Sequence, residues 1–205
     1  MSQNTSGLKS LLSIPFFYDM LQTVFGVTHS EREVPKLYFK IKDNHEVLDI
    51  GCGTAPILNF MPKSVVYTGY DISSEYINLA KKKYKKRENT FFFSDKIDKN
   101  SLPGRLFDRV ILNKLLHHLS DDEVIDMFTL AKSHLKGDGK VVTLDPCFIK
   151  NQRFISNWIV GHDRGENVRT PEQYTNLAEQ VFSNIKTKHR HTAWLHIDTH
   201  VMECY

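Results

Sequence analysis

Residues 47–55 read Val47-Leu48-Asp49-Ile50-Gly51-Cys52-Gly53-Thr54-Ala55. A short apolar run followed by closely spaced glycines is typical of a buried strand that ends in a tight loop. Glycine lets the backbone turn sharply and approach a ligand closely. A second acid, Asp71, follows 20 residues after Gly51 and ends the next predicted strand. The pattern favours a site for an adenosine cofactor, in which this acid binds both ribose hydroxyls.

Outward from this loop, short β-rich runs alternate with amphipathic helical segments. Strands are predicted at residues 46–50, 65–70, 91–93, 107–112 and 140–144, followed by a hairpin at 183–191 and 195–204. Helices are predicted at 17–25, from Ser30, from Ser73, from Ser120 to Gly137, at 154–160 and from Pro171. This alternation predicts a doubly wound α/β fold, Rossmann-like, whose mostly parallel seven-stranded sheet closes with an antiparallel C-terminal hairpin strand.

Polar residues follow the carboxyl ends of the predicted parallel strands. They are Asp71, Asp95, Asn113, His117 and Asp145. Ligands of doubly wound folds bind in the crevice outside these strand ends. The shared placement of the five residues therefore predicts one polar site along a single edge of the sheet.

NAD(P), flavins and S-adenosylmethionine all use a glycine loop with a ribose-binding acid, but three features favour S-adenosylmethionine. Asp49 precedes the turn, and a carboxylate there suits an ammonium and a sulfonium and repels a pyrophosphate. The loop continues with Ala55 and Pro56 and lacks the full dinucleotide fingerprint. Asp95 ends the third strand, where it can accept a hydrogen bond from an adenine amino group.

The sequence resembles the class I S-adenosylmethionine-dependent methyltransferase family over roughly residues 47–145. The matching motifs are Val47 to Thr54, Gly69-Tyr70-Asp71-Ile72-Ser73, Phe107-Asp108-Arg109-Val110-Ile111, Leu115-Leu116-His117-His118-Leu119 and Leu135-Lys136-Gly137-Asp138-Gly139-Lys140. One position departs from the family, because the usual third glycine is Ala55 here. The additional methyl group predicts a slightly tighter pocket.

The resemblance implies a set of cofactor contacts. Gly51 and Gly53 would line the methionine portion, with Asn113 close to it, and Asp71 would hold the ribose. Asp95 and Ile97 would border the adenine. The predicted contacts to S-adenosyl-L-methionine, and to its product S-adenosyl-L-homocysteine, are Asp49, Gly51, Gly53, Asp71, Ile72, Asp95, Ile97 and Asn113.

Methyl transfer from a sulfonium is an in-line displacement, so the protein must align the acceptor and exclude water. His117 and His118 are the candidate catalytic bases for a hydroxyl acceptor, and packing or helix capping is their alternative role. The candidate substrate contacts are Tyr18, His162, Arg164 and Arg169. The two arginines can instead form a structural network with the acids of the same loop.

We expect one domain over residues 1–205, with an N-terminal helical lid (1–43), a cofactor-binding core (44–146), and a substrate-side insertion with the closing hairpin (147–205). The 40% hydrophobic and 25% charged residues fit a globular protein. The three separated cysteines and the lack of a signal peptide or membrane span predict a cytoplasmic location. Oligomeric state stays open.

The net charge of +3 does not favour nucleic acid as a partner. The basic run 81–87 fits a solvated helix end, and the histidines of the final hairpin do not complete a clear metal site. The expected function is therefore methyl transfer to a small-molecule acceptor, with no metal. An RNA or protein methyltransferase, or a binding module without catalysis, are the alternatives that remain.

Overall fold

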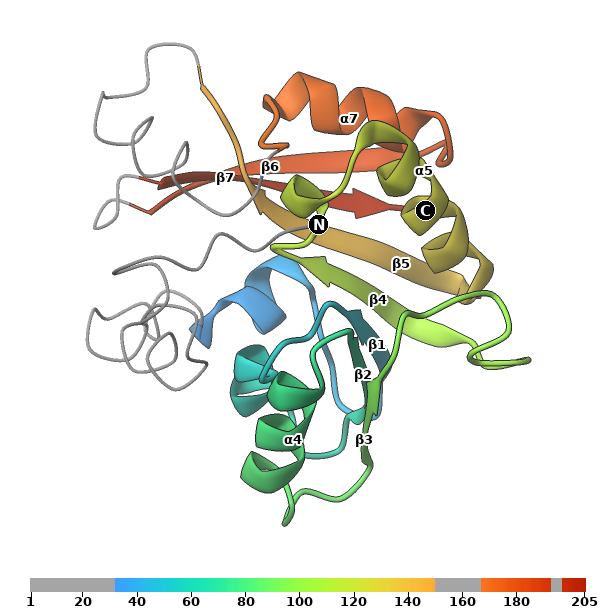
Figure 1. The fold of residues 1–205 in the computed structure, drawn as a ribbon. Helices are drawn as coiled ribbons and strands as arrows, with labels where there is room; N and C mark the ends of the chain where they lie inside the picture. Colours follow the sequence, from blue (N-terminus) through green and yellow to red (C-terminus); the bar gives the residue numbers. More distant parts are fainter. Residues whose placement is uncertain (1–31, 150–166, 193–196) are drawn as a thin grey trace, which may run out of the picture.

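The computed structural model of the chain describes residues 32–149, 167–192 and 197–205. A seven-stranded sheet runs through it in the order β3-β2-β1-β4-β5-β7-β6 (Figure 1). Its strands are β1 (Glu46–Ile50), β2 (Val66–Asp71), β3 (Thr90–Ser94), β4 (Phe107–Asn113), β5 (Leu135–Pro146), β6 (Ile185–Thr192) and β7 (Ile197–Cys204). The first five strands pair in parallel, and β7 is antiparallel to β5 and β6. The predicted doubly wound sheet with its antiparallel hairpin strand is confirmed.

Helices cover both faces of this sheet. They are η1 (Val34–Tyr38), η2 (Pro56–Phe60), α4 (Ser74–Lys83), η3 (Leu116–His118), α5 (Asp121–Ser133) and α7 (Pro171–Glu179). The predicted helix starts are confirmed at Ser73, Ser120 and Thr170, whose side chains accept hydrogen bonds from backbone N–H groups of the first turn. The helices predicted at 17–25 and 154–160 lie outside the described residues.

One predicted helix end was wrong. Gly137 was expected to stop the helix from Ser120, but α5 ends at Ser133 and β5 begins at Leu135. Gly137 and Gly139 both lie inside β5, and Gly139 is needed for the contact with β4. A Cβ atom on Gly139 would lie 2.6 Å from the Phe107 carbonyl oxygen, where the register between β4 and β5 shifts. The close approach of the two strands therefore requires glycine inside β5.

Two apolar clusters, one on each face, hold the layers together. Val124 and Phe128 of α5 pack with Tyr174 of α7 on one face. Leu58 of η2 and Ile77 of α4 belong to the cluster on the other face. Fully burying one such side chain contributes about 1.5–3 kcal/mol. Because the strand order reverses between β1 and β4, the loops after these strands diverge to opposite faces and leave a crevice at their carboxyl ends.

Candidate active site

The loop after β1 has the conformation that its glycines predict. Gly51 and Gly53 adopt φ angles of +75° and +55°, which L-residues rarely adopt. A Cβ atom on Gly51 would lie 2.9 Å from Leu115 Cδ1, so this position also lacks room. A Cβ atom on Gly53 would meet nothing within 4 Å. Gly53 therefore exposes bare backbone to open space, as close ligand approach requires.

Asp71, at the end of β2, joins this loop to the next helix. Its Oδ2 accepts a hydrogen bond of 2.8 Å from the Gly53 N–H, and its Oδ1 accepts one of 2.8 Å from the Ser73 N–H. A carboxylate oxygen can accept a second hydrogen bond. Asp71 thus has a fixed orientation and two remaining acceptor positions, which suits a pair of neighbouring hydroxyls.

Ala55 occupies the position of the family's third glycine. Its φ of +54° is left-handed, which costs an L-residue about 1–2 kcal/mol relative to the right-handed region. Ala55 is fully buried within the cluster that contains Leu58 and Ile77. The prediction of a tighter pocket was wrong, because the methyl group packs in the core and does not line open space.

Asp49, the acid before the turn, is 2% exposed. Its Oδ2 accepts a hydrogen bond of 2.5 Å from the Tyr67 hydroxyl, while its buried Oδ1 has no partner. Burial raises the pKa of Asp49 to about 7; the Tyr67 hydrogen bond opposes this rise, and the charge of Asp71 adds to it. A buried carboxylate oxygen without a partner is costly, and a nearby cation would relieve that cost.

The residues predicted at the adenine differ in exposure. Ile72 is 82% exposed and offers an apolar surface directly after Asp71. Asp95 is exposed, and its Oδ1 accepts a hydrogen bond of 2.8 Å from the Lys96 N–H. Ile97 is only 5% exposed and packs in the apolar cluster with α5, so it lies beneath the surface at the predicted adenine site. Asn113 is half-buried at the end of β4.

His117, in η3 after β4, and Asp145, near the end of the neighbouring strand β5, form a buried pair. The His117 Nδ1 lies 2.8 Å from Asp145 Oδ1, which also accepts a 3.3 Å hydrogen bond from the His117 backbone N–H. The two residues are 2% and 1% exposed, and Asp145 Oδ2 has no partner. His118 is exposed, and its ring lies 4.0 Å from that of His117. The geometry separates the two candidate bases into one buried and one exposed residue.

A comparison with known families agrees with this geometry. Residues 47–139 match the family described as a methyltransferase domain. This stretch of the chain is therefore similar to methyltransferase domains. A search of curated protein sequences found no match.

Solved structures resemble this chain in fold. The pyocyanin biosynthetic protein PhzM has a TM-score of 0.68 at 13% identity, over 85% of this chain and 54% of that chain. The mitomycin 7-O-methyltransferase MmcR has a TM-score of 0.68 at 14% identity, over 98% and 62%. A putative O-methyltransferase from Nostoc punctiforme PCC 73102 has a TM-score of 0.68 at 15% identity, over 86% and 56%. The chain therefore spans between half and two thirds of the length of these three proteins.

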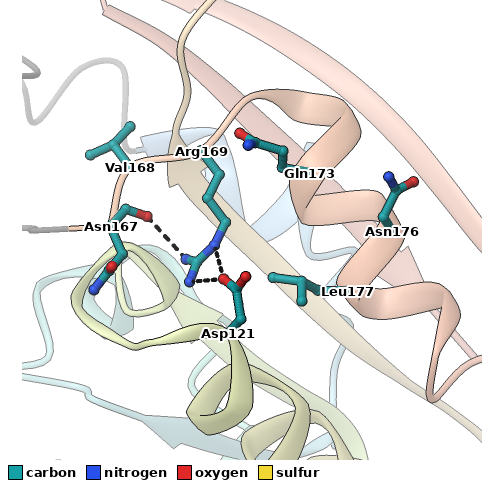
Figure 2. Close-up of a pocket in the computed structure, with 7 residues that line it drawn as sticks. All are labelled: Asp121, Asn167, Val168, Arg169, Gln173, Asn176 and Leu177. Carbon is teal, nitrogen blue, oxygen red and sulfur yellow. Dashed lines mark hydrogen bonds and ion pairs between the residues drawn. The ribbon is translucent and has the colours of Figure 1, made fainter.

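Arg169, a predicted substrate contact, has its guanidinium engaged within the protein. Its five N–H groups donate to Asp121 Oδ1 twice and to the carbonyl oxygens of Leu116, Leu119 and Asn167. Figure 2 shows this side chain in the wall of a hollow of about 400 Å³ near the start of α7. A substrate would have to displace one of these hydrogen bonds, so the structure favours an anchoring role for Arg169.

The segment around Arg169 also contacts the candidate base, because the Asn167 N–H donates a hydrogen bond of 3.1 Å to the His117 carbonyl oxygen. The chain segment that leads into α7 is thereby joined to η3. Tyr18, His162 and Arg164, the other predicted substrate contacts, lie outside the described residues.

The histidines of the β6–β7 hairpin gather around one acid that was not among the predicted site residues. Asp198 Oδ1 lies 3.0 Å from His189 Nε2 and 2.7 Å from His191 Nδ1. His200 is 5% exposed, and burial together with the charge of His189 lowers its pKa to about 4. In the described part of the chain, no group of three or more His, Cys, Asp or Glu side chains is arranged to hold a metal ion.

Proposed function

We propose that this protein is an S-adenosylmethionine-dependent methyltransferase that acts on a hydroxyl group of a small-molecule acceptor, with the crevice at the carboxyl ends of β1, β2, β4 and β5 as its active site. The observation that carries the proposal is a pair of buried carboxylates, Asp49 and Asp145, each with one oxygen that lacks a partner. Asp49 lies in β1 and Asp145 in β5, the two strands that flank β4. A polar group of a ligand that reached either oxygen would remove the cost of leaving that oxygen without a partner.

S-adenosylmethionine supplies an activated methyl group when bound, and the residues present fit it. Asp71 would accept hydrogen bonds from the ribose hydroxyls, and Gly51 and Gly53 would allow close approach of the methionine portion. Asp49 would face its positive charges. Ile72 and Asp95, with Ile97 beneath them, would border the adenine, and Asn113 would lie near the methionine.

His117 is the proposed catalytic base. A proton on Nδ1 donates to Asp145 Oδ1, which fixes the imidazole tautomer and leaves the lone pair on Nε2. Nε2 would take the hydroxyl proton as the acceptor oxygen attacks the methyl carbon. Such proton transfer contributes about 10²–10⁴-fold to the rate. The unpartnered Asp145 Oδ2 would accept a hydrogen bond from a second polar group of the acceptor.

The basic run at the end of α4 gives little support for an RNA acceptor. The Arg87 guanidinium donates to the carbonyl oxygens of Leu58 and Pro62 at 2.9 and 2.5 Å, so it serves the fold. The solved O-methyltransferases that share this fold include one that acts on mitomycin, by its name a small-molecule enzyme. Both points favour a small acceptor.

The same proposal includes residues 1–43 as a lid and residues 147–205 as the acceptor side of the domain. The structure describes part of each segment. None of the helices in the described ranges combines the length and the apolar character needed to cross a bilayer. The cytoplasmic location stays a prediction.

Calorimetric titration tests the proposed cofactor site. The wild-type protein should bind S-adenosylhomocysteine, and Asp71→Ala should lose about 1–3 kcal/mol of binding free energy with its charge-assisted hydrogen bonds. Equal affinity in the two proteins would contradict the placement of the ribose. Incubation with a panel of small phenols and alcohols, read out as S-adenosylhomocysteine formed, then tests the acceptor class. Turnover of RNA or protein but of no small hydroxyl compound would overturn that class.

A further inference from the structure

Helix α4 contacts two parts of the proposed cofactor site: Asp71 at its N-terminal end and the glycine loop after β1 at its C-terminal end. At its N-terminus, the Ser73 N–H donates to Asp71 Oδ1 at 2.8 Å. At its C-terminus, the Tyr84 hydroxyl donates to the Ala55 carbonyl oxygen at 2.6 Å, within the core. The helix lies along β2 and β3 (Figure 1). A single rigid element thus connects the ribose acid with the far side of the glycine loop.

Arg87, just beyond α4, extends this contact to the segment that follows the loop. Its Nη1 donates to Leu58 at 2.9 Å, and its Nη2 donates to Pro62 at 2.5 Å and lies 3.4 Å from the Met61 carbonyl oxygen. These carbonyl groups belong to the last turn of η2 and to the residues after it, and those of Leu58 and Pro62 also accept backbone hydrogen bonds from Met61 and Val65. The guanidinium therefore adds further donors at the C-terminal end of η2.

The loop needs such support because of Ala55. Gly51 and Gly53 adopt their left-handed φ angles freely, but Ala55 does not. Pro56 directly follows it and begins η2, so the chain cannot extend the helix backwards to relieve the strain. Three hydrogen bonds hold this residue in place: its N–H donates to the Cys52 carbonyl at 2.8 Å, and its carbonyl accepts from the Leu58 N–H at 3.2 Å and from the Tyr84 hydroxyl at 2.6 Å.

We propose that Tyr84 and Arg87 are positioning residues for cofactor binding, acting through α4 as a strut between Asp71 and the glycine loop. Neither side chain touches the cofactor in this arrangement. Tyr84 holds the left-handed Ala55, which keeps the Gly53 N–H in line with Asp71 Oδ2. This inference rests on the proposed function, since it assumes that the glycine loop and Asp71 bind S-adenosylmethionine.

Tyr84→Phe tests this positioning role, because it removes the hydroxyl but keeps the aromatic ring, whose centroid lies 6.0 Å from that of the Phe92 ring. The dissociation constants of S-adenosylmethionine and S-adenosylhomocysteine should rise by about 5–20-fold, as for loss of one buried hydrogen bond. The kcat at saturating S-adenosylmethionine should stay within about twofold, because no reacting group has moved. Tyr205→Phe, at the end of the chain, is the matched control and should change neither value.

Ala55→Gly distinguishes positioning from a general loss of stability. Glycine adopts a φ of +54° without the left-handed penalty, so the Tyr84→Phe/Ala55→Gly double variant should bind within about threefold of wild type. Two outcomes would contradict this positioning role. One is a Tyr84→Phe variant that has a lower Tm but binds S-adenosylhomocysteine with wild-type affinity. The other is weak binding in Tyr84→Phe that the additional Ala55→Gly substitution does not restore. Asp71→Ala, titrated in parallel, separates the two proposals: if only that variant loses affinity, the cofactor site stands and the strut fails.

Discussion

The two halves of the proposed site are assembled in different ways. In the cofactor half, formed by β1, β2 and α4, the contacts of Asp71 are short in sequence: Gly53 is 18 residues from Asp71, and Ser73 is 2, although the Tyr84 contact to Ala55 spans 29. In the acceptor half, formed by β4, β5, α5 and α7, His117 is 28 residues from Asp145, and Arg169 is 48 from Asp121. A local motif therefore encodes the contacts of Asp71 with the glycine loop, whereas the sheet topology brings the acceptor half together.

The largest effect is expected from Gly53→Val in the cofactor half. A branched side chain opposes the φ of +55° and fills the open space where the cofactor would approach, so binding of S-adenosylhomocysteine should be lost in calorimetry. Gly104→Val is the matched control, because Gly104 also has a positive φ, +70°, with nothing within 4 Å of a Cβ atom. Retained binding in Gly53→Val, or an equal loss in Gly104→Val, would contradict a local motif.

The acceptor half is tested by His117→Ala. Without a base, kcat should fall by about 10²–10⁴-fold, while the affinity for S-adenosylhomocysteine stays unchanged. His118→Ala is the control, because its exposed ring lies beside His117 without the Asp145 contact. A larger fall in kcat for His118→Ala would reverse the assignment, and a loss of cofactor affinity in His117→Ala would show that the halves are not independent.

The contrast also explains what the sequence could predict. Gly51, Gly53 and Asp71 were identified with their conformations and their joint placement, because spacing along the chain fixes them. The pairing of His117 with Asp145 was not predicted, although both residues were placed at strand ends, since it depends on the β4–β5 register. Arg169 was assigned to substrate because its partner, Asp121, comes from a distant helix.

Gly137 shows a further limit of reading a sequence. A glycine after an amphipathic helix signals a helix end, but Gly137 lies inside β5, where the nearby Gly139 allows a close approach to β4. The two uses look the same along the chain, and only the position of Phe107 on the neighbouring strand separates them. The strands themselves followed from local apolar patterning, which is why the fold was predictable.

Asp49 predicts a pH dependence that belongs to the cofactor half alone. Its folded-state pKa of about 7 lies well above the ordinary value for an aspartic acid, so the native state favours the protonated form. Stability without cofactor should therefore fall as the pH rises from 5 to 8, by about 2–4 kcal/mol more in wild type than in Asp49→Asn. Denaturant unfolding at several pH values measures this difference. Parallel curves for the two proteins would contradict a buried, ionising Asp49.

The smallest of these effects concerns Arg169. Arg169→Leu removes the donors of three carbonyl groups and of Asp121, and should lower the free energy of unfolding by about 2–3 kcal/mol. Arg105→Leu, whose guanidinium lies over the Phe107 ring, is the control and should cost less than about 1 kcal/mol. A rise in the acceptor KM without loss of stability would restore the substrate role that the sequence suggested.

A crystal structure with S-adenosylhomocysteine tests the central claim most directly. Both ribose hydroxyls should lie within hydrogen-bond distance of the Asp71 carboxylate, with the methionine portion against Gly51 and Gly53 and its ammonium on the side of Asp49. The sulfur should face the side of the crevice that holds His117 and Asp145. A ligand bound elsewhere, with the turn after β1 empty, would contradict the account.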